Sequence, residues 1–195
     1  MAKKQYLCTV KRSDRFYLYL PWPKYLAQWY AHEMYRLSKF EEDVQPAYMY
    51  NCDVEVSELE PVKTRRGSAE RNVLEMCLTK QPDAIPEPVN QAATICIEIP
   101  NFLGKPASTY NYLRPASREL LEQTVRNHFR LELTKYMNKM LFEYRIVRKG
   151  AAATQDKVIE TFMENNGIEY NETNLETIKQ VWKRLYGKIY KQKKA

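Results

Sequence analysis

In two short segments, apolar residues alternate with other residues at every second position. This period of two predicts β-strands, because successive side chains of a strand point to opposite faces. In residues 15–20 one face is apolar and the other carries Arg15, Tyr17 and Tyr19. In residues 93–99 isoleucine recurs at every second position from Ile95. A weaker pattern predicts a further strand over residues 5–11.

Apolar residues that recur every three or four positions predict helices in other segments. The first helix follows Pro21, because proline suits the first turn of a helix. Ser68 and Ser117 are suited to be N-caps, so each predicts a helix behind it. Two further helices are expected at about 154–166 and 173–191.

This order of elements predicts an α+β fold. It has short N-terminal strands with two helices, a further strand near 93–99, and a mainly helical C-terminal half. We expect a strand-helix-helix region over 1–82 with an acidic insertion at 41–60. A linker with a strand would follow over 83–115, and a helical region over 116–195.

Composition allows a packed core, because 44% of the 195 residues are hydrophobic. The formal charge of +7 favours a polyanionic partner. Residues 41–60 depart from this trend with seven acidic residues and no lysine or arginine. This block is interpreted as a solvated loop that offsets basic neighbours, with a carboxylate metal site as the alternative.

The chain contains none of the short motifs that mark common catalytic or phosphate-binding sites. We therefore expect no catalytic residues, no cofactor and no small-molecule substrate. The four cysteines are scattered, so no metal site is expected, and reduced thiols favour a cytoplasmic location. His32 and His128 are interpreted as surface or rim residues. No apolar run is long enough to span a membrane, so no membrane partner is expected.

The N-terminal strand and two helices resemble the ribbon-helix-helix family of DNA-binding proteins. The resemblance rests on the strand 15–20, the helix after Pro21, and the segment 67–70 that opens the second helix. About twenty-five residues separate the two helices where the family has a short turn. In that family a strand from each subunit of a dimer enters the major groove.

The resemblance implies that Arg15, Tyr17 and Tyr19 face base edges. It also implies that the backbone amides of Gly67 and Ser68, beside Arg65 and Arg66, hold a phosphate at a helix N-terminus. The alternative is an ordinary strand and two helices of an α+β core.

The last two predicted helices resemble a helix-turn-helix, with a basic second helix. That helix offers a second set of candidate DNA contacts, namely Lys179, Lys183, Arg184 and Lys188. The same lysines could instead form a solvated face.

These observations predict a non-enzymatic DNA-binding accessory or regulatory protein that forms a homodimer. Its general character is similar to accessory proteins of phages and mobile elements. The alternative is a structural component of a larger assembly that binds protein through basic and aromatic surfaces. The two differ in salt dependence, because phosphate contacts weaken steeply as salt rises.

Overall fold

The computed structural model describes residues 9–12, 15–38, 48–82, 89–140 and 151–192. The expected α+β class is confirmed, because five helices accompany a small mixed sheet and a two-stranded ladder. Three residues of the acidic block, Glu41, Glu42 and Asp43, lie outside the described residues.

The main sheet has four strands in the order β1-β2-β5-β3. Strand β2 (Arg15–Leu20) pairs antiparallel with β1 (Thr9–Arg12) on one side and with β5 (Ile95–Glu98) on the other. Strand β3 (Pro61–Lys63) lies parallel to β5 at the sheet edge. Both alternating segments therefore form strands, and they pair with each other at the centre of the sheet.

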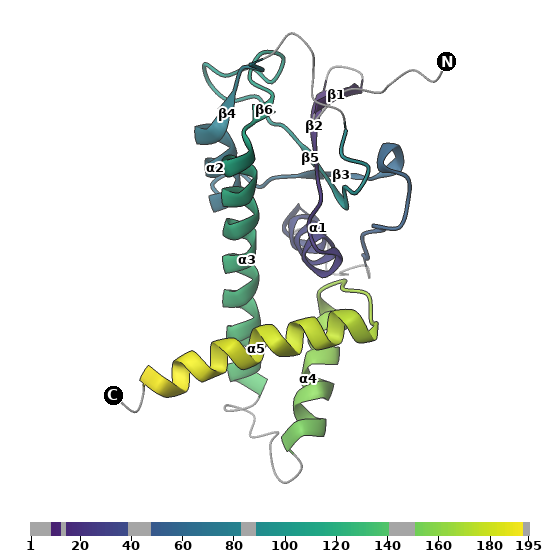
Figure 1. Ribbon diagram of the computed structural model, residues 1–195, viewed down its shortest axis with the longest axis vertical. Helices are drawn as coiled ribbons and strands as arrows, with labels where there is room; N and C mark the ends of the chain where they lie inside the picture. The colour runs from purple at the N-terminus through teal and green to yellow at the C-terminus, as the bar shows by residue number, and fades with distance from the viewer. Residues whose placement is uncertain (1–8, 13–14, 39–47, 83–88, 141–150, 193–195) are drawn as a thin grey trace.

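Helix α1 (Lys24–Ser38) lies between the sheet and the long helix α3 (Pro115–Asn138) (Figure 1). Every residue from Tyr25 to Met34 is buried, so the helix is covered on all sides and not along one stripe only. His32 is 8% exposed, which corrects its interpretation as a surface residue.

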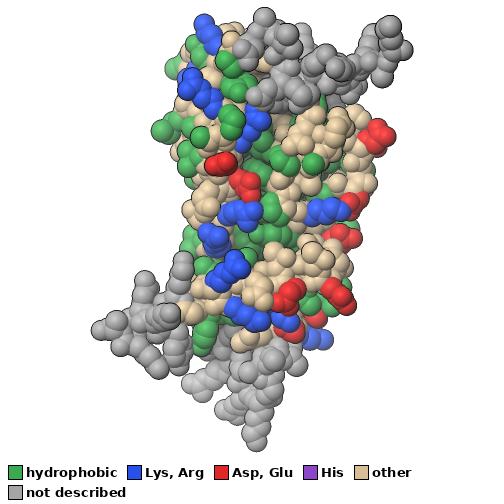
Figure 2. All heavy atoms as spheres, viewed as in Figure 1, with side chains coloured by type: hydrophobic (Ala, Val, Ile, Leu, Met, Phe, Trp, Pro, Cys, Tyr) green, Lys and Arg blue, Asp and Glu red, His purple; other side chains and the backbone are tan. Residues whose placement is uncertain are grey.

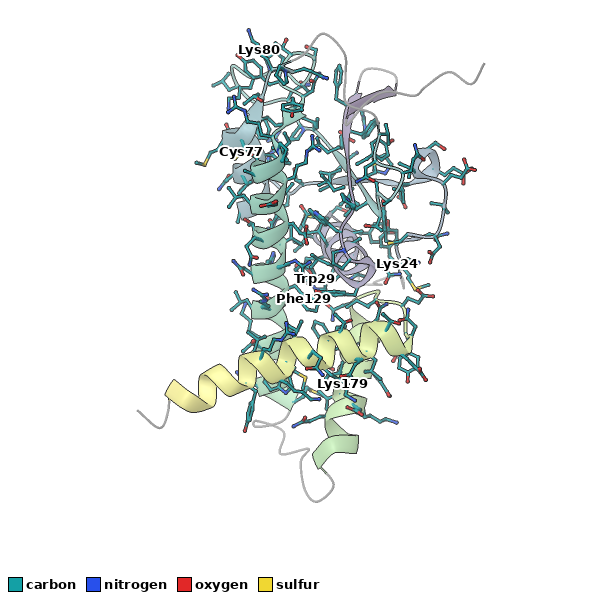
Figure 3. The ribbon with its side chains drawn as sticks, viewed as in Figure 1. Lys24, Trp29, Cys77, Lys80, Phe129 and Lys179 are labelled. Atoms are coloured by element: carbon teal, nitrogen blue, oxygen red, sulfur yellow. The ribbon has the colours of Figure 1, made fainter. Side chains whose placement is uncertain are left out.

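Aromatic rings fill the space between α1 and α3. Trp29 of α1 and Phe129 of α3 meet edge to face, with ring centroids 5.4 Å apart (Figure 3). Both side chains are almost fully buried. Edge-to-face contact suits aromatic rings, whose positive edges approach the negative face of a neighbour. This contact fixes the spacing of the two helices on either side of the cavity described below.

Helix α2 (Ala69–Cys77) packs on α3 and continues into β4 (Leu78–Thr79), which pairs with β6 (Tyr112–Leu113). Helix α3 begins earlier than expected. Arg114 is its N-cap without a side-chain hydrogen bond, and Pro115 occupies the first helical position. Ser117 therefore lies inside the first turn and is not the cap, because proline alone suffices to start the helix there.

Helices α4 (Ala151–Asn165) and α5 (Glu172–Gln192) pack against each other, and α5 crosses the C-terminal part of α3 (Figure 1). Gly167 ends α4 with a positive φ of 62°, the conformation expected of a glycine at this position. A short 3-10 turn over Val56–Glu58 precedes β3. In the part of the chain that the structure describes, no helix is both long and apolar enough to cross a membrane.

Candidate nucleic-acid interface

A basic turn connects β3 to α2. Arg65, Arg66 and Gly67 are exposed, and Gly67 adopts a positive φ of 76°. Ser68 caps α2 as expected, because its Oγ accepts a hydrogen bond from the backbone N–H of Arg71 at 3.2 Å. The two arginines therefore follow each other in sequence on a turn of defined geometry.

The backbone amides at this helix start are less available than the sequence suggested. The Ser68 amide donates to the Arg65 carbonyl at 3.2 Å, and this closes the turn. Glu70 lies in the first turn of α2, where its carboxylate takes up the positive end of the helix. Any phosphate bound here must therefore be held mainly by the guanidinium groups of Arg65 and Arg66.

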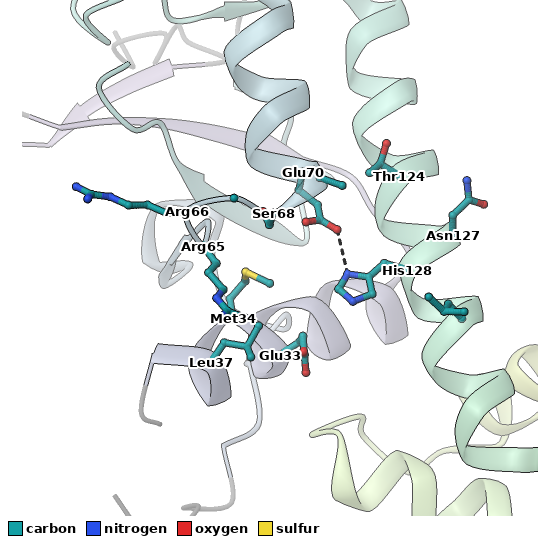
Figure 4. Close-up of a pocket in the computed structure, with 13 residues that line it drawn as sticks. Glu33, Met34, Leu37, Arg65, Arg66, Ser68, Glu70, Thr124, Asn127 and His128 are labelled. Carbon is teal, nitrogen blue, oxygen red and sulfur yellow. Dashed lines mark hydrogen bonds and ion pairs between the residues drawn. The ribbon is translucent and has the colours of Figure 1, made fainter. Parts of the chain in front are cut away.

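A pocket of about 750 Å³ opens beside this turn, between α1, α2 and α3 (Figure 4). It is bounded by residues from all three helices and from the turn itself. These residues are Glu33, Met34 and Leu37 of α1, Arg65 to Ser68 of the turn, Ala69 and Glu70 of α2, and Thr124, Asn127, His128 and Leu131 of α3. Figure 4 shows Arg65 directed toward the end of α1 at Met34 and Leu37, whereas Arg66 points away from the pocket.

Glu70 and His128 face each other across the inner wall of the pocket. Glu70 Oε1 lies 3.1 Å from His128 Nδ1 (Figure 4). Glu70 is 1% exposed, and its burial alone would raise its pKa. The pKa of Glu70 is nevertheless lowered, chiefly by the hydrogen bond from His128 and then by the Glu70 backbone amide, the charge of His128 and the Ser68 hydroxyl. The hydrogen bond from Glu70 raises the pKa of His128, which favours a charged pair.

The second carboxylate oxygen of Glu70, Oε2, is buried and has no hydrogen-bond partner among the described residues. Glu33, the other acidic residue of the pocket, is satisfied differently. Arg36 forms a fork with both of its oxygens, at 2.8 and 3.0 Å. Glu70 therefore carries the pocket's unused buried acceptor.

The tyrosines predicted to read bases are part of the protein core. Tyr17 is 6% exposed and Tyr19 is 4% exposed, so neither can reach a base edge in this structure. Strand β2 is also paired on both sides, which leaves no free edge for a strand of a second subunit. Arg15 is exposed but forms an ion pair with Glu98 of β5 at 3.1 Å. The alternating pattern failed here because both faces of β2 are covered.

The basic residues of α5 lie apart from the arginine turn, because α5 crosses α3 at the end away from α2 (Figure 1). Lys179 is bound to Asp156 of α4 at 3.0 Å and lies near Glu176 (Figure 3). Lys183 and Arg184 are exposed. Lys188 belongs to α5, but its side chain lies outside the described residues.

The surface view also shows that the basic side chains do not form one continuous patch on the face that it displays. On the face in Figure 2, lysine and arginine side chains are interrupted by acidic ones over the lower helices. Basic charge is therefore spread in separate groups on this face. Among the described residues no group of three or more metal-ligating side chains was found.

The pocket itself was not predicted from the sequence. Its inner pair joins residues 58 positions apart, and His128 was interpreted only as a surface or rim residue without a partner. The only sequence signal was an isolated histidine on the polar side of a long amphipathic helix. Such a residue gains a partner only when another helix packs across it.

Comparisons with protein-family models, with curated protein sequences and with solved structures found no match to this chain.

Proposed function

We propose that this protein binds DNA without catalysing a reaction on it, as an accessory or regulatory protein. The observation that carries the proposal is the exposed pair Arg65 and Arg66 on the turn that opens α2. The two side chains point in different directions, Arg65 toward the pocket and Arg66 away from it, so each can hold a separate phosphate (Figure 4). A guanidinium group suits phosphate oxygens, because it presents several N–H donors in a planar fork. The net charge of +7 adds long-range attraction to a polyanion.

Many other basic side chains of the molecule form ion pairs with a carboxylate, whereas Arg65 and Arg66 do not among the described residues. Ion pairs occupy Arg15, Lys24, Arg36, Arg126, Lys135 and Lys179. Within the described ranges no ion pair involves Arg65 or Arg66. A phosphate can therefore bind there without displacing an internal carboxylate, which makes this turn the best-supported contact surface.

Lys183 and Arg184 of α5 are the accessory contacts in this proposal, because both are exposed. Lys179 is a weaker candidate, since its ammonium group is already neutralised by Asp156. Arg15 is a weaker candidate for the same reason.

The proposal is tested by titrating a fluorescent mixed-sequence duplex at about 50 and 200 mM salt. The double variant Arg65→Ala with Arg66→Ala should bind about 10- to 100-fold more weakly at the lower salt. The slope of log affinity against log salt should fall by roughly two, because about one counterion is released for each phosphate contact.

A matched control removes two charges elsewhere. Lys24→Ala with Lys135→Ala has the same net charge, but both lysines are exposed and already paired, with Asp53 and Glu132. If this control weakens binding as much as the arginine variant does, the attraction is a property of net charge and not of the turn. Absence of duplex and single-strand binding at the lower salt would exclude the proposed function.

A second candidate function is a component of a larger protein assembly. It is favoured by two apolar side chains that lie in the open, Leu103 at 101% and Met76 at 79% exposure. They belong to neighbouring segments, because Lys105 Nζ donates to the Glu75 carbonyl at 2.6 Å. Binding through such a surface should change little between the two salt concentrations.

A further inference from the structure

The pocket beside Arg65 is much larger than a phosphate contact requires. Its volume of about 750 Å³ falls within the range of small-molecule sites. We propose that it receives an unstacked nucleobase of a single DNA strand whose backbone lies against Arg65 and Arg66. This inference rests on the proposed function and adds to it a preference for single strands over duplex.

The pocket has apolar side walls and a polar inner wall, an arrangement that matches the apolar faces and polar edges of a nucleobase. Met34 and Leu37 of α1 lie on one side and Leu131 of α3 on the other. Such aliphatic side chains can contact the faces of a base. Glu70 of α2 and His128 of α3 supply the polar groups of the inner wall (Figure 4). Thr124 and Asn127 lie at the α3 margin, where the Thr124 hydroxyl donates to the Leu120 carbonyl and the Asn127 amide points away from the cavity. Arg65 reaches toward this cavity, so one strand can place a phosphate at the turn and the adjoining base inside.

The unpartnered oxygen of Glu70 is an independent indication of a ligand. A buried carboxylate normally satisfies both oxygens, because a buried acceptor without a donor destabilises the fold. Glu70 uses Oε1 for His128, and no donor among the described residues meets Oε2 with good hydrogen-bond geometry. The Ser68 hydroxyl and the Glu70 backbone amide lie close enough to lower the pKa of this carboxylate, but they leave Oε2 with room for a better donor. Figure 4 shows this carboxylate on the pocket side of α2, between Ser68 and His128. Oε2 is covered in this structure, so the carboxylate must turn toward the pocket before a ring or amino N–H of a bound base can donate to it.

A base can enter such a recess only after it leaves its partner and its stack. In a duplex this costs a few kcal/mol, whereas a single strand exposes its bases at little cost. The pocket therefore predicts stronger binding of a single strand than of the duplex of the same sequence. The phosphate contacts at Arg65 and Arg66 are common to both.

The test compares three ligands of equal length by fluorescence anisotropy at about 50 mM salt. They are a mixed-sequence single strand, its duplex, and a single strand in which every nucleotide is abasic. The first should bind about ten-fold more tightly than the other two, because only an accessible base can enter the pocket and contribute to binding.

Two matched variants locate the effect. Leu131→Asn removes an apolar wall of the pocket, whereas Leu120→Asn changes a leucine of the same helix that does not line it. Both leucines are about half exposed, at 53% and 49%, so neither change should disturb folding, which urea denaturation checks. Leu131→Asn should weaken single-strand binding several-fold and leave duplex binding unchanged. Leu120→Asn should alter neither.

The outcomes separate the two proposals. If all three ligands bind equally and the arginine variant loses them all, the protein binds phosphate at the turn and the base pocket is wrong. If Leu131→Asn and Leu120→Asn have the same effect, the base does not enter this pocket. If no ligand binds, the proposed function and this inference both fail.

Discussion

Glu70 Oε1 lies 3.1 Å from His128 Nδ1 and joins the first turn of α2 to the middle of α3. Trp29 of α1 packs edge-on against the His128 ring, with centroids 5.2 Å apart. One buried carboxylate thus orders the three helices that surround the pocket.

Glu70→Gln should lower the free energy of unfolding by about 1–3 kcal/mol, because it replaces a buried charged acceptor with a neutral amide. Urea denaturation followed by circular dichroism measures the change. Glu132→Gln breaks the more exposed pair with Lys135 and serves as the control, with an expected effect below about 0.5 kcal/mol. Equal effects of the two substitutions would contradict a structural role for the buried pair.

The contribution of the Glu70–His128 pair to the free energy of unfolding should decrease both when the pH is raised and when it is lowered. The pKa of His128 is raised above 6.5, so its contribution is complete below that value and is lost as pH rises through the raised pKa. The pKa of Glu70 is lowered below 4.5, so its contribution is complete above that value and is lost as pH falls through the lowered pKa.

The difference in unfolding free energy between the natural protein and Glu70→Gln should therefore be largest between pH 4.5 and 6.5. Denaturation at a series of pH values measures it. NMR titration of the His128 ring should give a pKa that falls toward its ordinary value in the variant. A pH-independent difference would show that the pair is not charged.

Ser68→Ala should destabilise the protein by about 1 kcal/mol, because the Arg71 amide loses its side-chain acceptor. Ser68→Gly is the matched comparison, since glycine at an N-cap costs only a few tenths of a kcal/mol. Thermal denaturation of the two variants checks the order. If alanine and glycine are equivalent at this position, the cap contributes nothing.

Gly167→Ala should be far more damaging than Gly67→Ala. Both glycines have positive φ, which costs an alanine about 1 kcal/mol. A Cβ at Gly167 would also lie 2.4 Å from the Tyr48 carbonyl oxygen, whereas a Cβ at Gly67 meets nothing within 4 Å. Urea midpoints of the two variants measure the difference. Equal losses would mean that the backbone at Gly167 can move away from Tyr48.

Tyr50→Phe should destabilise the protein, whereas Tyr30→Phe should not. The Tyr30 hydroxyl is buried without a partner among the described residues, so its removal should be neutral or should stabilise by up to about 1 kcal/mol. The Tyr50 hydroxyl donates to the Glu60 carbonyl and accepts from the Cys96 amide, so its removal should cost about 1–3 kcal/mol. Loss of stability in both variants would reveal an unseen partner of Tyr30.

The local features of the fold were predictable because they depend on neighbouring residues. The alternating pattern placed strand β2 correctly along the chain, and Ser68 and Gly167 occupy the cap positions that their chemistry favours. Strand β3 was not predicted. It is three residues long, too short for a periodic pattern, and it exists because β5 offers it a parallel partner.

The candidate site was predictable only in part. Arg65 and Arg66 are exposed on the predicted turn, because a basic turn before an N-cap is a local feature. The burial of Tyr17 and Tyr19 could not be read from alternation, which assumes that one face of a strand meets solvent. The partnership of Glu70 with His128 depends on how α2 packs against α3, and no pattern within either helix encodes it.

The position of β2 at the centre of the sheet also constrains the order in which the chain folds. Its hairpin with β1 is local, but its pairing of Leu20 with Ile95 closes a loop of about 75 residues. Closing such a loop costs roughly 4 kcal/mol of chain entropy before the pairing is gained. Until residues 95–98 have been synthesised, the apolar surface of α1 lacks the completed sheet as its cover. This long-range pairing should therefore slow folding relative to a protein of the same length whose strands pair only with sequence neighbours.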